Sequence, residues 1–371
     1  MPLRDTALLM ASTLLLTSTS QAREVVVAVT PIEATASTLL AVELDVDAPP
    51  RLLGTVQHRL GHAPVGVVLD HASVALVVEV GNAGDALVVR KDLVTGAEVA
   101  MVDEAVSGQA PLLWSRPDGG SELLVVRLRS EEVRGGTFEV VGVDLTSGLS
   151  QVRAGGLRLW VTPFRGPADA LAPSYLVVDG AVGFQGPVSV AGAARREQTG
   201  DGHAHVDVVI DGTFVTRTRL GPGAYRSPTR HGARLFIEQS SSTTSSRLVE
   251  VGSGKVLMEG RPGLSPAVSA GGTLAVSSSK KDGSVLLGRG DAAWRVVSGA
   301  RAGVARPQLV LDDGDDVVVV VWLDRGASLP GELWRVGGTA RALLPPTPRT
   351  AVTVLGVLPP SPSKTVSKES R

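Results

Sequence analysis

The 371-residue sequence contains no cysteine, and aromatic residues make up only 3% of it. Without cysteine the chain forms no disulfide bond, so a large apolar core has to stabilise it. The same absence excludes a lipid-anchored bacterial lipoprotein, which needs a cysteine at its cleavage point. The shortage of aromatic rings argues against a carbohydrate cleft lined by stacking side chains.

An excess of charge of either sign is also missing. The formal net charge is −1, so no overall field attracts nucleic acid or an anionic membrane surface. The densest basic patch contains Arg226, Arg230 and Arg234, and it has the character of solvated surface. We therefore expect no nucleic-acid partner.

The first residues have the features of an export signal. Arg4 precedes the mostly apolar segment Ala7–Leu16, and Ser20-Gln21-Ala22 has small residues at the spacing of a cleavage site. These features predict a signal peptide over residues 1–22. The apolar run is shorter than the roughly 20 residues that a membrane-spanning helix needs, so we expect no span after cleavage. Together with the Ala-, Val-, Gly- and Arg-rich composition, this favours a periplasmic or secreted bacterial protein.

Helical periodicity is nearly absent from the rest of the chain. Short Val- and Leu-rich runs of about five to eight residues alternate with Gly, Pro, Asp and Ser, which is typical of strands and turns. Runs such as Val317–Trp322 are apolar throughout, as expected where both faces of a sheet are covered. The sequence predicts an all-β fold with stacked sheets.

A hairpin pattern repeats along the chain: an apolar–polar–apolar strand, a Gly turn, and a second apolar strand. Its clear copies are Lys91–Val99, Val143–Leu149 and Val249–Leu257. With weaker copies included, seven turns fall near residues 47, 96, 148, 212, 254, 290 and 337. Their spacing averages about 48 residues, which is typical of four-stranded propeller blades. We therefore predict a β-propeller over residues 23–358, with seven blades preferred and six or eight also compatible.

Proline-led apolar strands open several of these units, and turn residues follow them. Proline suits the first residue of a strand because it has no N–H to give to a ladder, and Asp-Gly makes a tight turn. The opening strands that we predict are Pro64–Leu69, Pro111–Trp114, Pro173–Val178, Pro266–Ser269 and Pro307–Leu311.

The turn Trp114-Ser115-Arg116-Pro117-Asp118-Gly119, followed by the hairpin Asp144-Leu145-Thr146-Ser147-Gly148, resembles the repeat of TolB-like and WD-like β-propeller proteins. The resemblance covers most of Pro64–Pro345. It implies a propeller fold and a protein partner in the bacterial cell envelope. Arg116 interrupts the usual Ser-Pro-Asp run, and the α/β domain that precedes the propeller of TolB has no counterpart here.

The two ends of the predicted propeller complete it. Arg23–Thr30 and Arg349–Leu358 are strands without hairpins of their own, and the first repeat lacks an opening strand. We expect the terminal strand to complete the first blade and close the ring, which removes exposed sheet edges. An insertion is expected between Val178 and His205. Residues 359–371 are rich in Pro, Ser and Lys and are predicted to be disordered.

One segment has the composition of a metal site. Asp201, His203, His205 and Asp207 alternate, so a strand would place them on one face. Two imidazoles with a flanking carboxylate can hold a divalent metal, and we take His203, His205 and Asp207 as the candidate ligands. The alternative is a polar edge strand beside the insertion. No other cofactor is predicted.

Three further motifs are expected to be structural, and no catalytic residue is predicted. The histidines in connections and turns (His58, His62 and His71) have the character of packed or solvated side chains. Asp312–Asp316 lacks the spacing of an EF-hand calcium loop and indicates a hairpin turn. Ser277–Lys280 matches Ser-x-x-Lys, but the supporting Ser-Asp-Asn and Lys-Thr-Gly motifs are absent.

The connections between second and third strands are the long and variable ones, and they should all project from one face of the ring. These loops are Val80–Asp85, Arg129–Gly136, Gln239–Arg247, Ser278–Ser284 and Asp324–Gly331. Loops on a rigid scaffold commonly carry binding. The sequence therefore favours a noncatalytic binding or scaffolding module for a protein or glycan partner. The alternative is a propeller hydrolase or lyase with a polar site at the central channel, with or without a metal, which would need carboxylates or histidines there.

Overall fold

The computed structural model describes residues 23–359, apart from short gaps and one longer one. The gaps are residues 61, 81–85, 107, 131–136, 159, 168, 180–203, 221–223, 232–233, 241–245, 261–265, 270, 279–281, 290–293, 299–300, 314–315, 325–330, 338–339 and 347–348. Every regular element within the described residues is a β-strand, so the all-β prediction is confirmed. No helix in this part of the chain is long and apolar enough to cross a membrane.

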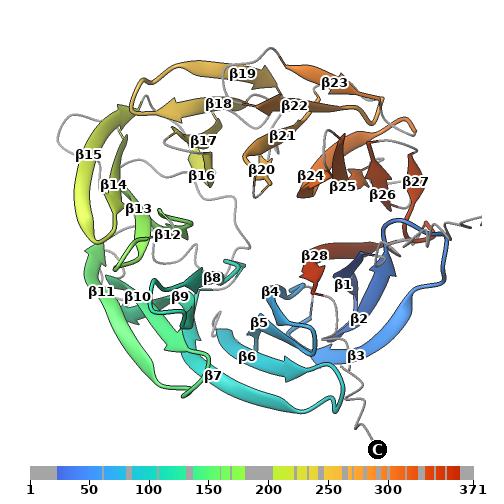
Figure 1. Cartoon of the computed structure of the whole chain (residues 1–371), viewed down its shortest axis with the longest axis horizontal. Helices are drawn as coiled ribbons and strands as arrows, with labels where there is room; N and C mark the ends of the chain where they lie inside the picture. Colours follow the sequence, from blue (N-terminus) through green and yellow to red (C-terminus); the bar gives the residue numbers. More distant parts are fainter. Residues whose placement is uncertain are drawn as a thin grey trace, which may run out of the picture.

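The strands form five four-stranded antiparallel sheets and one eight-stranded sheet, arranged around a central axis (Figure 1). The sheet that contains both ends has the order β28-β1-β2-β3, and we call it the closing sheet. Its strands are β1 (Glu24–Pro31), β2 (Ala36–Glu43), β3 (Arg51–Gln57) and β28 (Thr350–Leu358). The eight-stranded sheet contains β4 (Val65–Asp70), β5 (Ser73–Glu79), β6 (Ala86–Asp92), β7 (Glu98–Ala105), β8 (Leu112–Ser115), β9 (Ser121–Ser130), β10 (Thr137–Asp144) and β11 (Ser150–Arg158).

The other four sheets each run outward from the axis in chain order. The first two contain β12 (Trp160–Phe164), β13 (Ser174–Asp179), β14 (Ala204–Ile210) and β15 (Thr213–Leu220), then β16 (Ala224–His231), β17 (Arg234–Ser240), β18 (Ser246–Val251) and β19 (Val256–Gly260). The last two contain β20 (Ala267–Val268), β21 (Thr273–Ser277), β22 (Val285–Arg289) and β23 (Arg295–Val297), then β24 (Val304–Asp313), β25 (Asp316–Asp324), β26 (Glu332–Val336) and β27 (Arg341–Ala342).

The predicted Gly hairpins are the outer hairpins of these sheets. In the turn that joins β10 to β11, the N–H of Gly148 donates to the carbonyl of Asp144 over 2.8 Å, and Gly148 has a φ of 72°. Gly96 and Gly254 make the same bond in their turns, each over 2.9 Å. The backbone N–H of Ser147 donates to the carboxylate of Asp144 and lowers the pKa of that carboxyl. All seven predicted turn positions lie between the two outermost strands of a meander, as predicted.

Closure of the ring follows from the pairing of the two chain ends. β1 is hydrogen-bonded to β2 on one side and to β28 on the other, with Glu24 opposite both Glu43 and Leu358. Four consecutive residues of β1, Val25–Ala28, are fully buried. Val26 and Ala28 pack in one apolar cluster, and Val25 and Val27 in another, so both faces of the strand are covered. The prediction that the terminal strands complete one unit is confirmed.

The same two-sided burial explains the run Val317–Trp322. Val319 and Val321 of β25 pack with residues of β21 and β22, whereas Val320 packs with residues of the closing sheet. Alternate side chains of one strand thus fill the spaces on both sides of its sheet. Burying each such side chain contributes about 1.5–3 kcal/mol, and this apolar packing takes the place of disulfide bonds.

One predicted opening strand is wrong. Pro173–Val178 corresponds to β13, the second strand of its sheet, and the innermost strand is β12, which contains Pro163. Pro163 lies opposite Tyr175 of β13, and its other side is the unpaired inner edge of the sheet. Proline is tolerated there because that edge donates to no ladder. In this sheet the proline of the inner strand, Pro163, lies within that strand, and Pro173 precedes the second strand.

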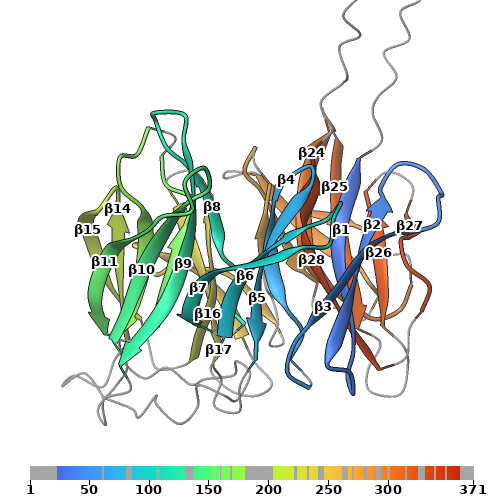
Figure 2. The same ribbon diagram turned by 90° about the horizontal axis from the view of Figure 1, so that it is seen from below.

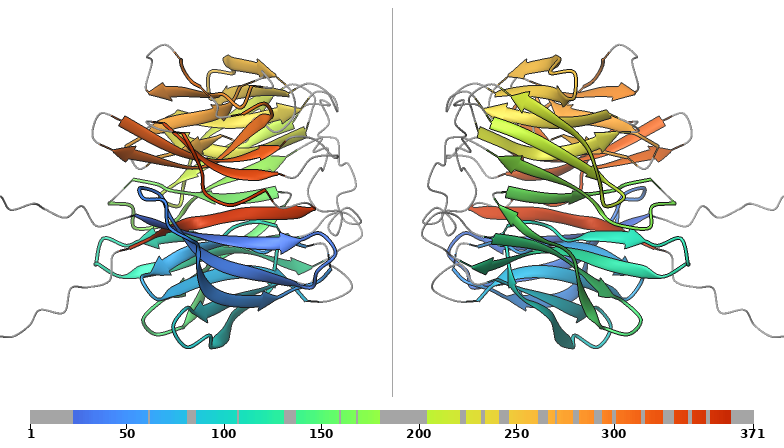
Figure 3. Two further views of the ribbon diagram at one scale, coloured as in Figure 1. Left: turned by 90° about the vertical axis from the view of Figure 1, so that its right-hand side faces the viewer. Right: turned by 90° about the vertical axis from the view of Figure 1, so that its left-hand side faces the viewer.

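Antiparallel meanders divide the connections between two faces of the disc, which is seen from its edge in Figures 2 and 3. The turns between strands one and two and between strands three and four lie on one face, which we call the turn face. The loops between strands two and three, and the links between sheets, lie on the opposite loop face. All five predicted variable loops connect a second strand to a third, as predicted, although most of their residues lie outside the described ones.

Candidate functional site

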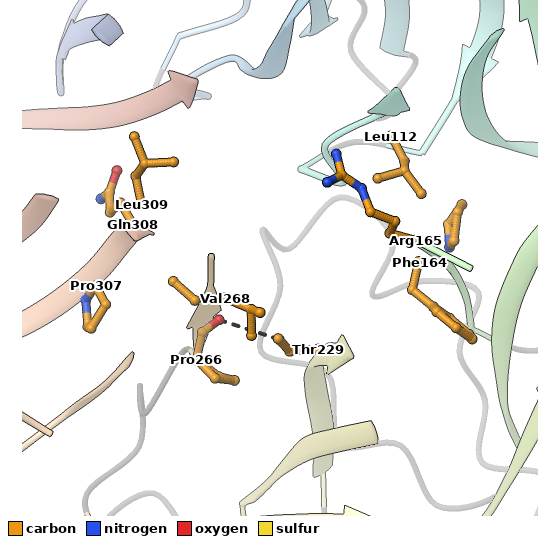
Figure 4. A pocket seen from close by; sticks show the side chains of 11 residues that line it. Leu112, Phe164, Arg165, Thr229, Pro266, Val268, Pro307, Gln308 and Leu309 are labelled. Atoms are coloured by element: carbon orange, nitrogen blue, oxygen red, sulfur yellow. Dashed lines mark hydrogen bonds between the residues drawn. The ribbon is translucent and has the colours of Figure 1, made fainter. Parts of the chain in front are cut away.

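A cavity of about 360 Å³ lies at the axis of the ring, where the inner strands converge (Figure 4). Its walls come from or directly adjoin β8, β12, β16, β20 and β24, so segments almost 200 residues apart in sequence meet there. The lining residues are Leu112, Pro163, Phe164, Arg165, Thr229, Pro266, Ala267, Val268, Pro307, Gln308 and Leu309.

The walls of the cavity are mostly apolar. Three of the lining residues are prolines, which have no N–H, and five others have aliphatic or aromatic side chains. Arg165 is the one charged residue among the described residues that line the cavity. The same set contains no carboxylate and no imidazole, so these walls offer no pair of groups for general acid–base catalysis.

The amide of Gln308 joins two neighbouring sheets at the cavity wall. Its Nε2 donates to the carbonyl of Val352 over 3.2 Å, and its Oε1 accepts from the N–H of Val354 over 2.8 Å. Val352 and Val354 belong to β28, so this one side chain bonds the backbone of β28 as a neighbouring strand would, at the point where the ring closes. Thr229 makes a weaker link, donating to the carbonyl of Pro266 over 3.4 Å. These polar groups hold sheets together.

A buried chain of hydroxyl and imidazole groups lies near the loop face of the closing sheet. Thr30 Oγ1 and Ser37 Oγ are 2.5 Å apart, and Ser37 Oγ is 2.8 Å from Nε2 of His58. Nδ1 of His58 lies 2.8 Å from the carbonyl of Arg59, which only accepts, so Nδ1 carries the proton and Nε2 accepts from Ser37. This resembles the pairing of a nucleophile with its base. Ser37 is fully buried, however, so no substrate reaches its hydroxyl.

The next link carries a second histidine. Nδ1 of His62 lies 2.8 Å from the buried carboxylate of Glu79, and the N–H of Arg59 donates to the carbonyl of Glu79 over 2.7 Å. Both connection histidines are therefore packed against polar partners, as predicted. Their contacts fasten the first link to the end of β5 at the loop face.

Exposed aliphatic side chains lie on the same segments of the loop face, which these hydrogen bonds connect. Ile32, Leu60 and Val80 are each more than half exposed. The backbone bond from His58 to Thr35 joins the link to the β1–β2 loop, and the bond from Arg59 to Glu79 joins it to the residue before Val80. We call Ile32, Leu60 and Val80 the aliphatic patch. It gives the loop face apolar surface that the fold does not bury.

The predicted metal ligands are placed only in part. His205 and Asp207 lie two residues apart on β14, on the same face as predicted, whereas Asp201 and His203 lie outside the described residues. The carboxylate of Asp207 accepts from both Nε and Nη2 of Arg217, each over 2.7 Å. No group of three or more metal-ligating side chains is found in the part of the chain that the structure describes. The metal site stays a prediction.

The other two motifs have structural surroundings. Asp312 is the penultimate residue of β24, in the hairpin that the sequence predicted, and its carboxylate accepts from the N–H of Gly271 and the hydroxyl of Thr273, each over 2.8 Å. Burial alone would raise the pKa of Asp312, but hydrogen bonds from Ser269, Thr273 and Gly271 lower it overall. Ser277 is buried and donates to the neighbouring carbonyl of Ser278. Lys280 lies outside the described residues.

Sequence reasoning did not single out Arg165, Thr229 or Gln308. Two of these residues closely follow a lining proline, in Pro163-Phe164-Arg165 and in Pro307-Gln308. A proline within an innermost strand was therefore the available signal. It does not reveal by itself which residues around it face the axis.

Comparisons with known proteins agree with this architecture. No protein family and no curated protein matches the chain. Among solved structures, the hypothetical selenium-binding protein from Sulfolobus tokodaii matches with a TM-score of 0.51 at 12% identity, over 91% of this chain and 93% of that one. The β-propeller domain of the Trilobed protease from Pyrococcus furiosus matches with a TM-score of 0.46 at 13% identity, over 87% and 97% of the two chains. TolB from Acinetobacter baumannii matches with a TM-score of 0.45 at 13% identity, over 76% of this chain and 65% of that one. At these identities the first match supports the fold alone, and the fold is that of a β-propeller.

Proposed function

We propose that this chain is a noncatalytic binding or scaffolding module of the bacterial cell envelope, built as a seven-bladed β-propeller. The observation that carries the proposal is the chemistry of the axial cavity. Its described lining residues include no carboxylate and no imidazole, which are the groups that a hydrolase or lyase at the channel would need. Binding without chemistry is the role that remains for such a scaffold.

The count of seven rests on how the eight-stranded sheet is built. Strands β4–β7 and β8–β11 are two four-stranded meanders, and β7 joins β9 through the single pair Ala105–Arg127. Each meander has its own inner strand and its own Gly hairpin. Counting them separately gives seven units, in agreement with the seven repeated turns.

The loop face is the proposed binding surface, and a protein is the proposed partner. The aliphatic patch of Ile32, Leu60 and Val80 is surface of the kind that protein interfaces bury. It contains no aromatic ring on which a sugar would stack, so a protein is favoured over a glycan. The predicted signal peptide and the resemblance to TolB-like repeats support an envelope location.

The test compares the two faces of the disc. The double variant Leu60→Asp/Val80→Asp places charge on the loop face, and Val94→Asp/Leu149→Asp places the same charge on exposed aliphatic side chains of the turn face. The protein, immobilised in turn as wild type and as each variant, is exposed to envelope extract of the host. We expect one partner to be retained by wild type and by the turn-face variant but reduced at least tenfold by the loop-face variant. Equal retention by both variants, or none by wild type, would refute the loop face as the binding surface.

The alternative is an enzyme whose metal is held by His203, His205 and Asp207. The observation in its favour is that His205 and Asp207 share one face of β14. Metal analysis of the purified protein, compared with His203→Ala and His205→Ala, tests it directly. A stoichiometric divalent metal that both substitutions remove would support the alternative, and a metal-free wild type would end it.

A further inference from the structure

We infer that the partner of the loop face is an acidic protein segment with aliphatic side chains. This inference rests on the proposed function, because it takes the loop face as the binding surface and adds the chemistry of what binds there. Two features of that face support it. One is the sign of the charges in its connections, and the other is the position of two arginines beside the aliphatic patch.

The connections on the two faces of the disc differ in charge. In the sequence, the links between successive units contain no aspartate or glutamate, and their arginines are Arg59, Arg261, Arg301 and Arg349. The loops between second and third strands add six basic and seven acidic residues, so the connections of the loop face have an excess of three positive charges. The turns of the opposite face contain three basic and seven acidic residues, an excess of four negative charges. The disc is therefore polarised, although the net charge of the whole chain is only −1.

Two of the link arginines adjoin the aliphatic patch. Arg59 directly precedes Leu60, and its guanidinium lies 3.9 Å from the carboxylate of Glu79. The carbonyl of Arg349 accepts from the N–H of Ile32 over 2.8 Å. The side chain of Glu79 is only 2% exposed, so it presents no carboxylate to a partner. The surface beside the patch is therefore basic on two sides.

Glu33, the neighbour of Ile32, is the exposed acid beside the patch. Its carboxylate lies 3.3 Å from the guanidinium of Arg349, and the two side chains are 81% and 80% exposed. An ion pair between such exposed side chains contributes little to stability, because water solvates both charges. Arg349 can therefore exchange Glu33 for a carboxylate of a partner at little cost.

The apolar and the charged parts of this surface together select the partner. Protein interfaces combine a buried apolar centre with a polar rim, and complementary charges raise the rate at which the partners meet. A nucleic acid would use the positive charge but would leave Ile32, Leu60 and Val80 uncovered. A protein segment in which aspartate or glutamate flanks leucine, isoleucine or valine would cover the patch and would also pair with the arginines.

The probe is a phage-displayed library of random dodecapeptides, selected on the immobilised chain. Clones that are also retained by Leu60→Asp/Val80→Asp are discarded, which leaves peptides that need the aliphatic patch. We expect these peptides to be enriched in acidic and aliphatic residues and depleted in lysine and arginine relative to the unselected library. The association rate of a synthetic consensus peptide should fall at least tenfold between about 50 and 500 mM salt, because the charges that steer it are exposed.

Arg59→Gln/Arg349→Glu lowers the positive charge beside the patch and should weaken the affinity for the consensus peptide at least tenfold. The matched control is Lys255→Gln/Arg295→Glu, which makes the same change in net charge at the turn face and on the outer strand β23. It should bind the peptide like wild type. Glu33→Gln removes the exposed acid and should tighten binding severalfold, which is the opposite of what a general loss of structure would give.

The inference is overturned if the patch-dependent clones carry no excess of acidic residues, if the arginine variant binds the peptide like wild type, or if no clone depends on the patch. Binding of phosphatidylglycerol vesicles in place of any peptide would equally overturn it, in favour of a lipid surface. Retention of a partner from envelope extract still judges the loop face by itself, so the inference and the proposed function can fail separately. Circular dichroism shows whether each variant is folded, and Arg349→Glu alone keeps the test valid if the double variant does not fold.

Discussion

Gln308 offers a direct test of how the ring is closed. Its amide makes two hydrogen bonds to β28, one to the carbonyl of Val352 and one from the N–H of Val354. A typical hydrogen bond contributes about 0.5–1.5 kcal/mol to folding. Gln308→Ala removes both bonds and should lower the free energy of unfolding by about 2 kcal/mol. Urea denaturation followed by tryptophan fluorescence measures this loss.

Gln109 provides the matched control. Its Nε2 donates a single hydrogen bond of 2.8 Å to the carbonyl of Val161, between neighbouring sheets that do not contain the chain ends. Its Oε1 is buried without a hydrogen-bond partner, so Gln109→Ala removes one bond together with one unsatisfied acceptor and should cost at most about 1 kcal/mol, no more than half the loss at Gln308. Comparing the two stability losses shows whether the loss at Gln308 comes from its two hydrogen bonds to β28 or from removing any glutamine side chain.

Gln308→Glu adds a dependence on pH that a purely steric effect would not show. At neutral pH the carboxylate still accepts from Val354, but its second oxygen faces the carbonyl of Val352, where both atoms are acceptors. Below the pKa of the introduced carboxyl, the protonated group can donate to Val352 again. The variant should therefore be less stable than wild type at pH 7 and recover toward wild type near pH 4. A loss under about 0.5 kcal/mol in Gln308→Ala, or a pH-independent difference in Gln308→Glu, would falsify this account.

Three further predictions concern other parts of the ring. Gly148→Ala should cost about 1 kcal/mol because φ is 72° there and a Cβ strains the backbone without meeting any neighbour, whereas Gly148→Asn should cost much less; urea denaturation compares them. The lowered pKa of Asp312 means that its contribution to stability is present above the carboxyl's unfolded pKa of about 3.9 and is lost as pH falls through the folded value. Asp312→Asn should thus flatten the acid limb of the stability–pH curve, while Asp316→Asn, an exposed residue of the same turn, should leave it unchanged. Truncation after Pro346 removes β28 and uncovers the buried edge of β1, so the product should aggregate on size-exclusion chromatography, whereas removal of residues 360–371 should leave a monodisperse protein.

The parts of the fold that were predictable from sequence are those whose cause is local. The turn at Gly148 needs a residue that tolerates positive φ. It also needs an aspartate four residues before the glycine, Asp144, whose carboxylate accepts from backbone N–H groups of the turn. Both residues are visible in the sequence. The assignment of loops to one face followed from the alternation of antiparallel strands alone. Ring closure followed from a missing strand at one end and a spare strand at the other.

The sequence-based predictions were wrong or missing where a feature of the fold depends on tertiary contacts. Pro173 and Pro163 both precede or lie within apolar runs, and only the pairing of β12 with β13 shows which run is innermost. Ser37 and His58 are 21 residues apart, and no local sequence pattern indicates that they share a buried hydrogen bond. The axial cavity combines residues from Leu112 to Leu309, so its composition exists only once the ring has closed.

Part of the cavity's apolar character has a structural origin, and this bears on what the cavity does. Prolines occur on inner strands because the inner edge of each sheet has no partner, and Gln308 and Thr229 link neighbouring sheets. A cavity explained by these needs alone would be apolar and uncharged. The apolar lining is thus accounted for by the way the inner strands meet and by the links between sheets.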